Sequence, residues 1–364
     1  MPLNIVHGNL AAFRADALVN PSNSLLRGGG GVSGFLFKAA GWDDLQRACD
    51  AIGYCVPGQA VITPAFSLPA RYVIHTVGPV YRGGGQNEAQ LLRNAYINSL
   101  ELARRHGLES IAFPLISSGT YGYPQAEAVS IAIRSIRTWL DGQEEEMTVT
   151  LVLFNRQEMS LDARLSMPVS RALRQAEYQN RDIRYSLRDP DRTAPHDRTG
   201  ALRDAALTEH TIYQADLDVL RRVEEAAARE PAAEVSMQEA KPLSLSELIK
   251  QKDEGFSDTL LRLIDARGLT DAEVYKRANI DRKHFSKIRI NPGYTPSKTT
   301  ALALAIALKL TRDETDNLLA RAGYALSPAR TMDIIIAHFL DVGNYNIDDI
   351  NAVLFSHEQG TLGV

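Results

Sequence analysis

The sequence has few cysteines and no long apolar run, and both absences limit what the protein can be. It contains two cysteines, Cys49 and Cys55, too few for disulfides to hold a chain of 364 residues together. The longest helical apolar stretch, 301–308, is far shorter than the roughly 20 residues that cross a bilayer. The first residues lack the basic segment and apolar segment of a secretion signal. We therefore expect a cytoplasmic protein with reduced thiols and no membrane partner.

The remaining composition is that of an ordinary globular chain. Hydrophobic residues make up 45% and charged residues 23%, so neither general disorder nor a fibrous repeat is expected. At about 150 residues per domain, a chain of 364 residues suggests about two domains. The net charge of −4 gives no global sign of nucleic-acid binding, although an average of this kind can conceal a basic segment.

Three regions differ in their residue patterns. Residues 1–175 alternate short β-branched runs with amphipathic helical patterns, which favours a sheet covered by helices. Residues 187–244 are charged, contain several prolines and have little apolar periodicity, so we predict a mostly flexible linker with a solvated helix over 216–230. Residues 245–364 have helical patterns throughout and are predicted to form an all-helical domain.

The predicted strands of the first region are separated by predicted helices. Because a helix follows a strand in alternation, we expect a sheet with a large parallel component between two helical layers. The strands are expected at 15–20, 71–77, 110–114 and 148–154, and the helices include 88–106 and a closing helix over 171–186.

A run of four glycines, Gly28–Gly31, is the strongest single signal in the chain. Glycine allows the backbone to approach a ligand closely, and the apolar helix expected over 35–41 follows directly. A glycine loop that opens a helix presents free N–H groups and the positive end of the helix dipole to an anion. The spacing over 29–34 also fits the dinucleotide fingerprint G-x-G-x-x-G, but residues 21–27 separate it from the preceding strand, unlike in Rossmann domains. A merely flexible loop is the other alternative.

A second loop, 117–124, has the same physical character. It reads Ser-Ser-Gly-Thr-Tyr-Gly-Tyr-Pro, and proline is favoured at the start of a helix. Loops that leave neighbouring parallel strands converge at the carboxyl edge of a sheet, so the two glycine loops are expected to bind a diphosphate together. Neither loop ends in the Lys-Ser/Thr pair of a P-loop, which disfavours triphosphate hydrolysis with Mg²⁺. We expect neither a metal nor a cofactor.

Together with these loops, further segments resemble the macrodomain family. The resemblance covers about the first 170 residues in the expected order and rests on 8–10, 15–23, 28–34, 72–79 and 111–123. It implies a three-layer α/β/α module with a mostly parallel mixed sheet. It also implies a site for ADP-ribose, either free or attached to a macromolecule.

The resemblance implies a set of ligand contacts. Asn9 stands where the family usually has an aspartate that accepts a hydrogen from the adenine amino group; an asparagine oxygen also accepts, without charge assistance. Phe154 matches the ring that stacks on adenine, although a core aromatic is the alternative interpretation. Asn23 matches the asparagine at the distal ribose. The other ligand-binding residues that the resemblance implies are Leu10, Asn20, Gly29, Gly30, Gly31, Val32, Ser118, Gly119, Thr120, Tyr121 and Gly122.

The candidate catalytic residues are Asn23 and Ser33, and Ser33 departs from the family pattern. Hydrolytic members usually have an aspartate there that helps to activate water, and Phe37 replaces a histidine often found four residues later. A serine hydroxyl is a poor base, and losing a general base typically costs about 10²–10⁴ in rate. The leading interpretation is ADP-ribose binding with hydrolysis of ADP-ribosyl groups. The alternative is a non-enzymatic, ADP-ribose-responsive regulator or reader.

The helical region resembles a phage-repressor (Xre-type) helix-turn-helix domain over about 70 residues. Residues 256–327 hold 12 basic and 8 acidic side chains, a net charge of +4 where the whole chain has −4. Nucleic acid and a partner protein both remain possible targets, because such bundles also serve as docking modules. Candidate nucleic-acid contacts are Arg282, Lys283, His284, Lys287 and Arg289. Helices are expected at 259–266, 271–278, 282–288, 298–310, 312–321, 332–340 and 347–355.

Overall fold

The structure is a computed structural model that describes residues 2–143, 146–154, 163–188 and 254–363. Met1–Arg181 and Glu254–Val364 form one compact unit, and Asp182–Asp253 form a second, of which only the end of one helix is described. The helix predicted at 216–230 and almost all of the predicted linker therefore lie outside the described residues. No helix within the described ranges is long and apolar enough to span a membrane.

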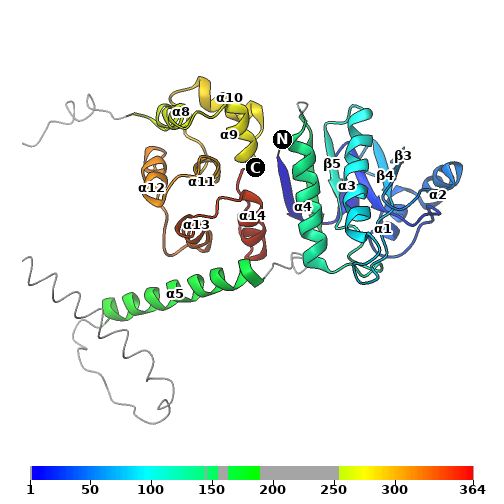
Figure 1. Cartoon of the computed structure of the whole chain (residues 1–364), viewed down its shortest axis with the longest axis horizontal. Coiled ribbons are helices and arrows are strands. Elements are labelled where there is room, and N and C mark those ends of the chain that lie inside the picture. The colour runs from blue at the N-terminus through cyan, green and yellow to red at the C-terminus, as the bar shows by residue number, and fades with distance from the viewer. Residues whose placement is uncertain (1, 144–145, 155–162, 189–253, 364) are drawn as a thin grey trace, which may run out of the picture. The chain divides into compact units, whose positions relative to one another are not determined.

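A six-stranded sheet forms the centre of the N-terminal region, in the order β1-β6-β5-β2-β4-β3 (Figure 1). All neighbouring pairs are parallel except β3 and β4, which confirms the predicted mixed, mostly parallel sheet. The two edge strands, β1 and β3, were not among the predicted strands, because their apolar runs are too short to distinguish from loops. The strands are β1 (Leu3–His7), β2 (Ala17–Pro21), β3 (Ala60–Pro64), β4 (Tyr72–Thr76), β5 (Ser110–Phe113) and β6 (Thr148–Leu153).

Successive side chains of each strand enter different apolar layers, as the two-residue period of a strand requires. Leu18 of β2 is buried with residues of α1 (Gly31–Ala40) and α2 (Trp42–Ile52). Its neighbour Val19 is buried on the other face with residues of α3 (Glu88–Arg105) and α4 (Gln125–Asp141), which lie side by side (Figure 1). The predicted arrangement of helix, sheet and helix layers is therefore present.

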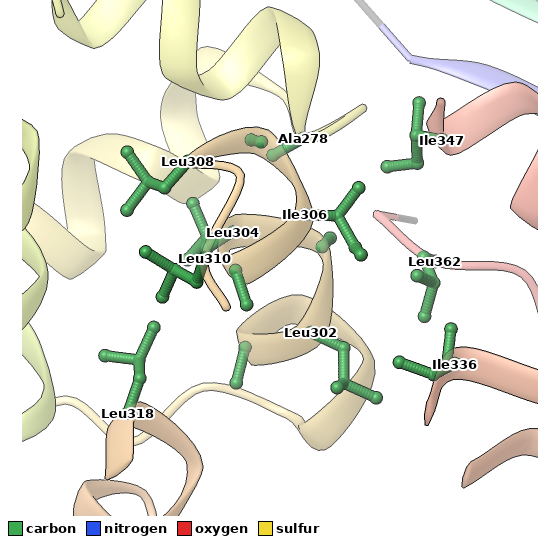
Figure 2. Packing of buried hydrophobic residues seen from close by; sticks show 14 of the residues in the cluster. Ala278, Leu302, Leu304, Ile306, Leu308, Leu310, Leu318, Ile336, Ile347 and Leu362 are labelled. Atoms are coloured by element: carbon green, nitrogen blue, oxygen red, sulfur yellow. The ribbon is translucent and has the colours of Figure 1, made fainter. Parts of the chain in front are cut away.

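The C-terminal helices bury a separate apolar cluster around α11 (Lys298–Ala307). Every residue from 300 to 307 is buried, as expected for a helix that is hydrophobic all round. Leu302 and Ile306 point toward the side of Ile336 and Leu362, whereas Leu310 lies on the opposite side of the helix (Figure 2). The other helices are α5 (Ala163–Arg188), α8 (Phe256–Ala266), α9 (Asp271–Arg277), α10 (Arg282–Ile290), α12 (Arg312–Arg321), α13 (Thr331–Asp341) and α14 (Ile347–Ser356).

Side-chain caps fix where several of these helices begin. Thr270 and Thr311 each form a capping box with the glutamate three residues later, at the starts of α9 and α12. The side chains of Asp281 and Ser297 cap α10 and α11 more simply, because each accepts one hydrogen bond from the backbone N–H three residues later. These local signals explain why the predicted helices agree with the observed ones to within a few residues. The helix expected over 171–186 is part of α5, whose Val169 is buried in the C-terminal cluster.

Candidate functional site

Loops at the carboxyl ends of five strands enclose a pocket of about 480 Å³. Segments after β1, β2, β4, β5 and β6 contribute to its walls, and the glycine run that opens α1 completes them. Both glycine loops line this one pocket, which is the arrangement that the sequence predicted for parallel strands. The volume is typical of a site for a small ligand.

The glycines of the first loop serve different purposes. Gly31 has a φ of +59°, which glycine adopts without strain, and a Cβ added there would meet nothing within 4 Å. A Cβ on Gly28 would lie 2.7 Å from the Trp42 ring, and one on Gly34 would lie 2.5 Å from the carbonyl oxygen of Gly29. The N-cap of α1, Gly30, has no side chain to bond the first amides of the helix. The loop therefore leaves the positive end of α1 open to the pocket.

The second loop is held in shape by its own hydrogen bonds. Gly122 N–H donates to the Gly119 carbonyl at 2.8 Å, and Tyr123 N–H donates to the Ser117 carbonyl at 3.0 Å. The Ser118 hydroxyl donates to the Leu115 carbonyl at 3.1 Å. Tyr81 N–H donates to the Tyr121 carbonyl at 2.9 Å, tying the loop to the segment that follows β4. These four hydrogen bonds within the protein fix the conformation of the loop.

The described residues of the pocket wall include almost no ionisable groups. Tyr121 is the only ionisable side chain among the described lining residues, and burial raises the pKa of its phenol above the ordinary value. The phenol is therefore neutral at physiological pH. Backbone N–H groups and the dipole of α1 are left to stabilise a bound anion. Among the described residues, no group of three or more His, Cys, Asp or Glu side chains is placed to hold a metal ion.

Three serine hydroxyls in the pocket wall have no hydrogen-bond partner in the described part of the chain. The Oγ atoms of Ser22, Ser33 and Ser117 are buried and unbonded among the described residues. Leaving a buried hydroxyl unpaired typically costs about 1–3 kcal/mol. A ligand with hydroxyl or phosphate oxygens would satisfy them, so the wall suits a polar, oxygen-rich ligand.

Asn9 and Asn23, which are predicted to contact opposite ends of the ligand, also form hydrogen bonds with the backbone of their own loops. The Asn23 oxygen accepts from the backbone of Leu25 and Arg27, and its amide nitrogen donates to the Arg27 carbonyl at 2.8 Å. The Asn9 oxygen accepts from Ala11 N–H at 3.0 Å and caps a short 3₁₀ turn. Both residues line the pocket. Their side chains therefore fix the loops that precede the glycine run and follow β1.

Two predicted ligand-binding residues, Asn20 and Gly122, are not part of the pocket wall. Asn20 is fully buried, and its amide nitrogen lies 3.0 Å from Nδ1 of His75, whose Nε2 lies 2.9 Å from the Thr63 hydroxyl. Burial lowers the pKa of His75 to about 4, so the ring is neutral at physiological pH. Asn20 therefore supports the sheet behind the pocket. The sequence did not reveal this, because the pairing with His75 depends on the register of β2 and β4.

All the other predicted site residues of the N-terminal region line the pocket. The structure adds lining residues that sequence reasoning missed. Five of the eleven, Gly8, Ala11, Pro21, Ser22 and Ser117, are direct chain neighbours of predicted residues, so for these adjacency was the available signal. Phe35 is different, because it reaches the pocket from the second turn of α1. The added residues are Gly8, Ala11, Pro21, Ser22, Phe35, Gly78, Pro114, Leu115, Ile116, Ser117 and Val152.

Comparison with known proteins identifies the family. A family model described as Macro domain matches residues 19–132. An O-acetyl-ADP-ribose deacetylase from Citrobacter rodentium is 46% identical over 167 residues, which cover 45% of this chain and 94% of that protein. This chain belongs to the macrodomain family. The match covers the macrodomain region and leaves more than half of the chain outside it.

Solved macrodomain structures match a similar share of the chain. The Oceanobacillus iheyensis macrodomain with ADP is 40% identical and covers 43% of this chain and 85% of that one, with a TM-score of 0.41. The Trypanosoma brucei macrodomain in complex with ADP-ribose is 35% identical and covers 43% of this chain and 65% of that one, with a TM-score of 0.40.

Proposed function

We propose that the macrodomain binds ADP-ribose and slowly hydrolyses the bond between its distal ribose and an attached group. The observation that carries this proposal is the convergence of both glycine loops on one pocket whose described lining residues have no charged side chain. Such a pocket suits a diphosphate held by backbone N–H groups. Related proteins are named O-acetyl-ADP-ribose deacetylase, so an ester or glycosidic bond at the distal ribose is the expected target.

The ligand's orientation follows from which loops would hold each part. The adenine would lie between Asn9 and Phe154, and the 59% exposure of Phe154 leaves much of that side chain accessible. Residues 29–32 and 118–121 would hold the diphosphate from its two sides. The distal ribose would then lie near Asn23 and Ser33, which makes them the residues closest to the reacting bond.

The chemistry of this pocket favours slow turnover. A water molecule that attacks the bond must lose a proton, and no described lining side chain is a carboxylate or an imidazole. The Ser33 hydroxyl orients a nucleophile by hydrogen bonding but does not remove its proton at neutral pH. A phosphate oxygen of the bound substrate is then the nearest available base. We therefore expect rates about 10²–10⁴ below those of a site with a positioned base.

The proposal predicts both binding and turnover by the full chain. Calorimetry with ADP-ribose is expected to show binding to one site. Incubation with O-acetyl-ADP-ribose, and separately with ADP-ribosylated protein and nucleic acid, is expected to release ADP-ribose slowly in at least one case. Absence of ADP-ribose binding would contradict the proposal. Binding without any turnover would leave the reader function, in which the chain recognises ADP-ribose without hydrolysing it.

We also propose that α10 contacts nucleic acid and thereby directs the macrodomain to its target. Three basic side chains of this helix, Arg282, Lys283 and Lys287, are exposed and have no ion-pair or hydrogen-bond partner among the described residues. The other two candidates are engaged: Arg289 pairs with Asp271, and the His284 ring lies 3.1 Å from the Tyr294 hydroxyl. Unpaired cations on one helix favour contacts with phosphates.

Charge reversal on α10 tests this second proposal. Lys283→Glu combined with Lys287→Glu is expected to lower nucleic-acid affinity at least tenfold and to flatten its dependence on salt, because phosphate contacts are lost. A mobility-shift titration at several salt concentrations measures both effects. Lys38→Glu with Lys309→Glu makes the same change in net charge away from α10 and serves as the control. A wild-type chain that binds no nucleic acid would favour docking to a protein instead.

A further inference from the structure

The outer edge of β1 is bonded by a side chain from the C-terminal helices. Among the described strands β1 pairs with β6 alone, so its other edge has no neighbouring strand in that part of the chain. Asn279 occupies part of that edge: its Oδ1 accepts from Leu3 N–H at 2.7 Å, and its Nδ2 donates to the Leu3 carbonyl at 3.0 Å. A side-chain amide has the same donor and acceptor as a peptide group. The Asn279 side chain therefore makes the two hydrogen bonds to Leu3 that a residue of a neighbouring strand would make.

The turn between α9 and α10 holds Asn279 in place. Its φ is +56°, a left-handed conformation that asparagine and glycine adopt most readily, and its side chain is fully buried. The chain near Gly363 packs on this turn, because a Cβ added to Gly363 would lie 2.2 Å from the Ala278 carbonyl oxygen. Glycine at position 279 would satisfy the turn equally well. The turn alone therefore does not require asparagine, whereas the contact with β1 requires its side-chain amide.

Further contacts hold these helices against the macrodomain. Arg137 of α4 donates from Nε to Asp348 of α14 at 2.9 Å and from its guanidinium to Asn279 Oδ1 at 3.2 Å. The Arg137 and Asp348 side chains are each only 16% exposed, so solvent screens their ion pair weakly. Ala352 and Phe355 of α14 are buried in the same apolar cluster as residues of β1 and α4. The contact at Asn279 thus belongs to a packed interface.

β1 connects this interface to the adenine end of the pocket. The strand ends at His7, and the next residues, 8–11, line the pocket. Gly8 N–H donates to the Leu153 carbonyl at 3.0 Å, which links β1 to the end of β6 just before Phe154. Both residues assigned to adenine, Asn9 and Phe154, therefore follow the two strands at this edge. Fraying of β1 would move Asn9 relative to Phe154.

We infer that Asn279 is a positioning residue for the adenine end of the pocket, acting through β1. The inference rests on the proposed function, because it assigns adenine to Asn9 and Phe154. Without the two bonds to Leu3, the edge strand opens more often, and the adenine-binding loop is held in its binding conformation for a smaller fraction of the time.

Asn279→Gly in the full chain tests the inference, because glycine keeps the turn and removes only the amide. We expect faster amide hydrogen exchange in β1, at Leu3 and Ile5, with unchanged exchange in β2. ADP-ribose affinity, measured by calorimetry, is expected to fall about fivefold to tenfold, within the usual range of coupling between sites. The affinity for inosine diphosphate ribose, which lacks the adenine amino group, should fall less, so that discrimination between the two ligands decreases.

Two further variants control for general destabilisation. Asp348→Asn weakens the same interface without changing Asn279 and should shift exchange and discrimination in the same direction. Asn291→Gly makes the same residue change at the end of α10, where the Asn291 side chain accepts a hydrogen bond from Gly293 N–H two residues later, and it should leave both exchange and discrimination unchanged. If Asn279→Gly keeps the wild-type affinity and discrimination, the inference is wrong and the proposed function still stands. A wild-type chain that does not bind ADP-ribose would overturn the proposed function and the inference together.

Discussion

Gly31→Glu is expected to lower the affinity for ADP-ribose by at least 100-fold. Gly31 lines the pocket at the start of α1, where the backbone N–H groups face the proposed diphosphate. A glutamate there places a negative charge beside the phosphates, and like charges at short range repel each other. It also requires a bulky residue at a φ of +59°, which adds strain. Calorimetric titration with ADP-ribose measures the loss.

Gly107→Glu separates the effect on the ligand from the effect on the backbone. Gly107 has nearly the same φ, +61°, and a Cβ there would also meet nothing within 4 Å, but it lies at the end of α3 and outside the pocket wall. The two variants should lose similar amounts of thermal stability, whereas only Gly31→Glu should lose binding. Unchanged affinity in Gly31→Glu would remove the glycine run from the ligand site.

Ser33→Asp is expected to raise the turnover of ADP-ribosyl substrates by about 10²–10⁴, the usual contribution of a general base. The Ser33 hydroxyl is buried in the pocket wall and has no hydrogen-bond partner among the described residues, so we expect a carboxylate at this position to face the ligand. Ser33 lies in the first turn of α1, where the helix dipole favours a negative charge. Release of ADP-ribose from a modified protein, followed with time, measures the change.

Ser33→Asn is the matched control, because it has the shape of aspartate without a basic oxygen. We expect turnover close to that of the wild type in Ser33→Asn and a large increase in Ser33→Asp alone. ADP-ribose affinity must be measured in both variants, since the new carboxylate also repels the diphosphate. Equal or lower turnover in Ser33→Asp, with affinity preserved, would mean that the missing base does not limit the reaction.

The interior strands of the macrodomain could be predicted because their patterns are strong. β2, β4, β5 and β6 have β-branched runs and are largely buried, as strands covered on both faces must be. β1 and β3 lie at the edges and are only partly buried, so their sequences differ less from those of loops. The C-terminal helices were predicted closely because their caps are local, as Thr270 and Thr311 illustrate.

The candidate site could be predicted wherever a loop's chemistry is visible in its own residues. The glycine run and the loop over 117–124 both line the pocket, and the resemblance to macrodomains supplied the ligand. Asn20 illustrates what the sequence could not show: its neighbour in space, His75, lies 55 positions further along the chain. Only the parallel pairing of β2 with β4 brings the two together. That Ser33 stands where hydrolytic macrodomains usually have an aspartate was visible in the sequence. The absence of a carboxylate or an imidazole from the described pocket wall was not.

The amino-acid sequence by itself determined the positions of the interior strands and helices, and it identified two loops suited to binding an anion. Those features depend on neighbours within a few residues along the chain, so they can be recognised locally. The tertiary structure decided which loops share a pocket and which asparagine completes the edge of β1. Leu3 and Asn279 are 276 positions apart, and no local preference of either residue specifies their pairing. Contacts of that kind form only when the whole chain packs, because burial and geometry then select among many chemically equivalent partners.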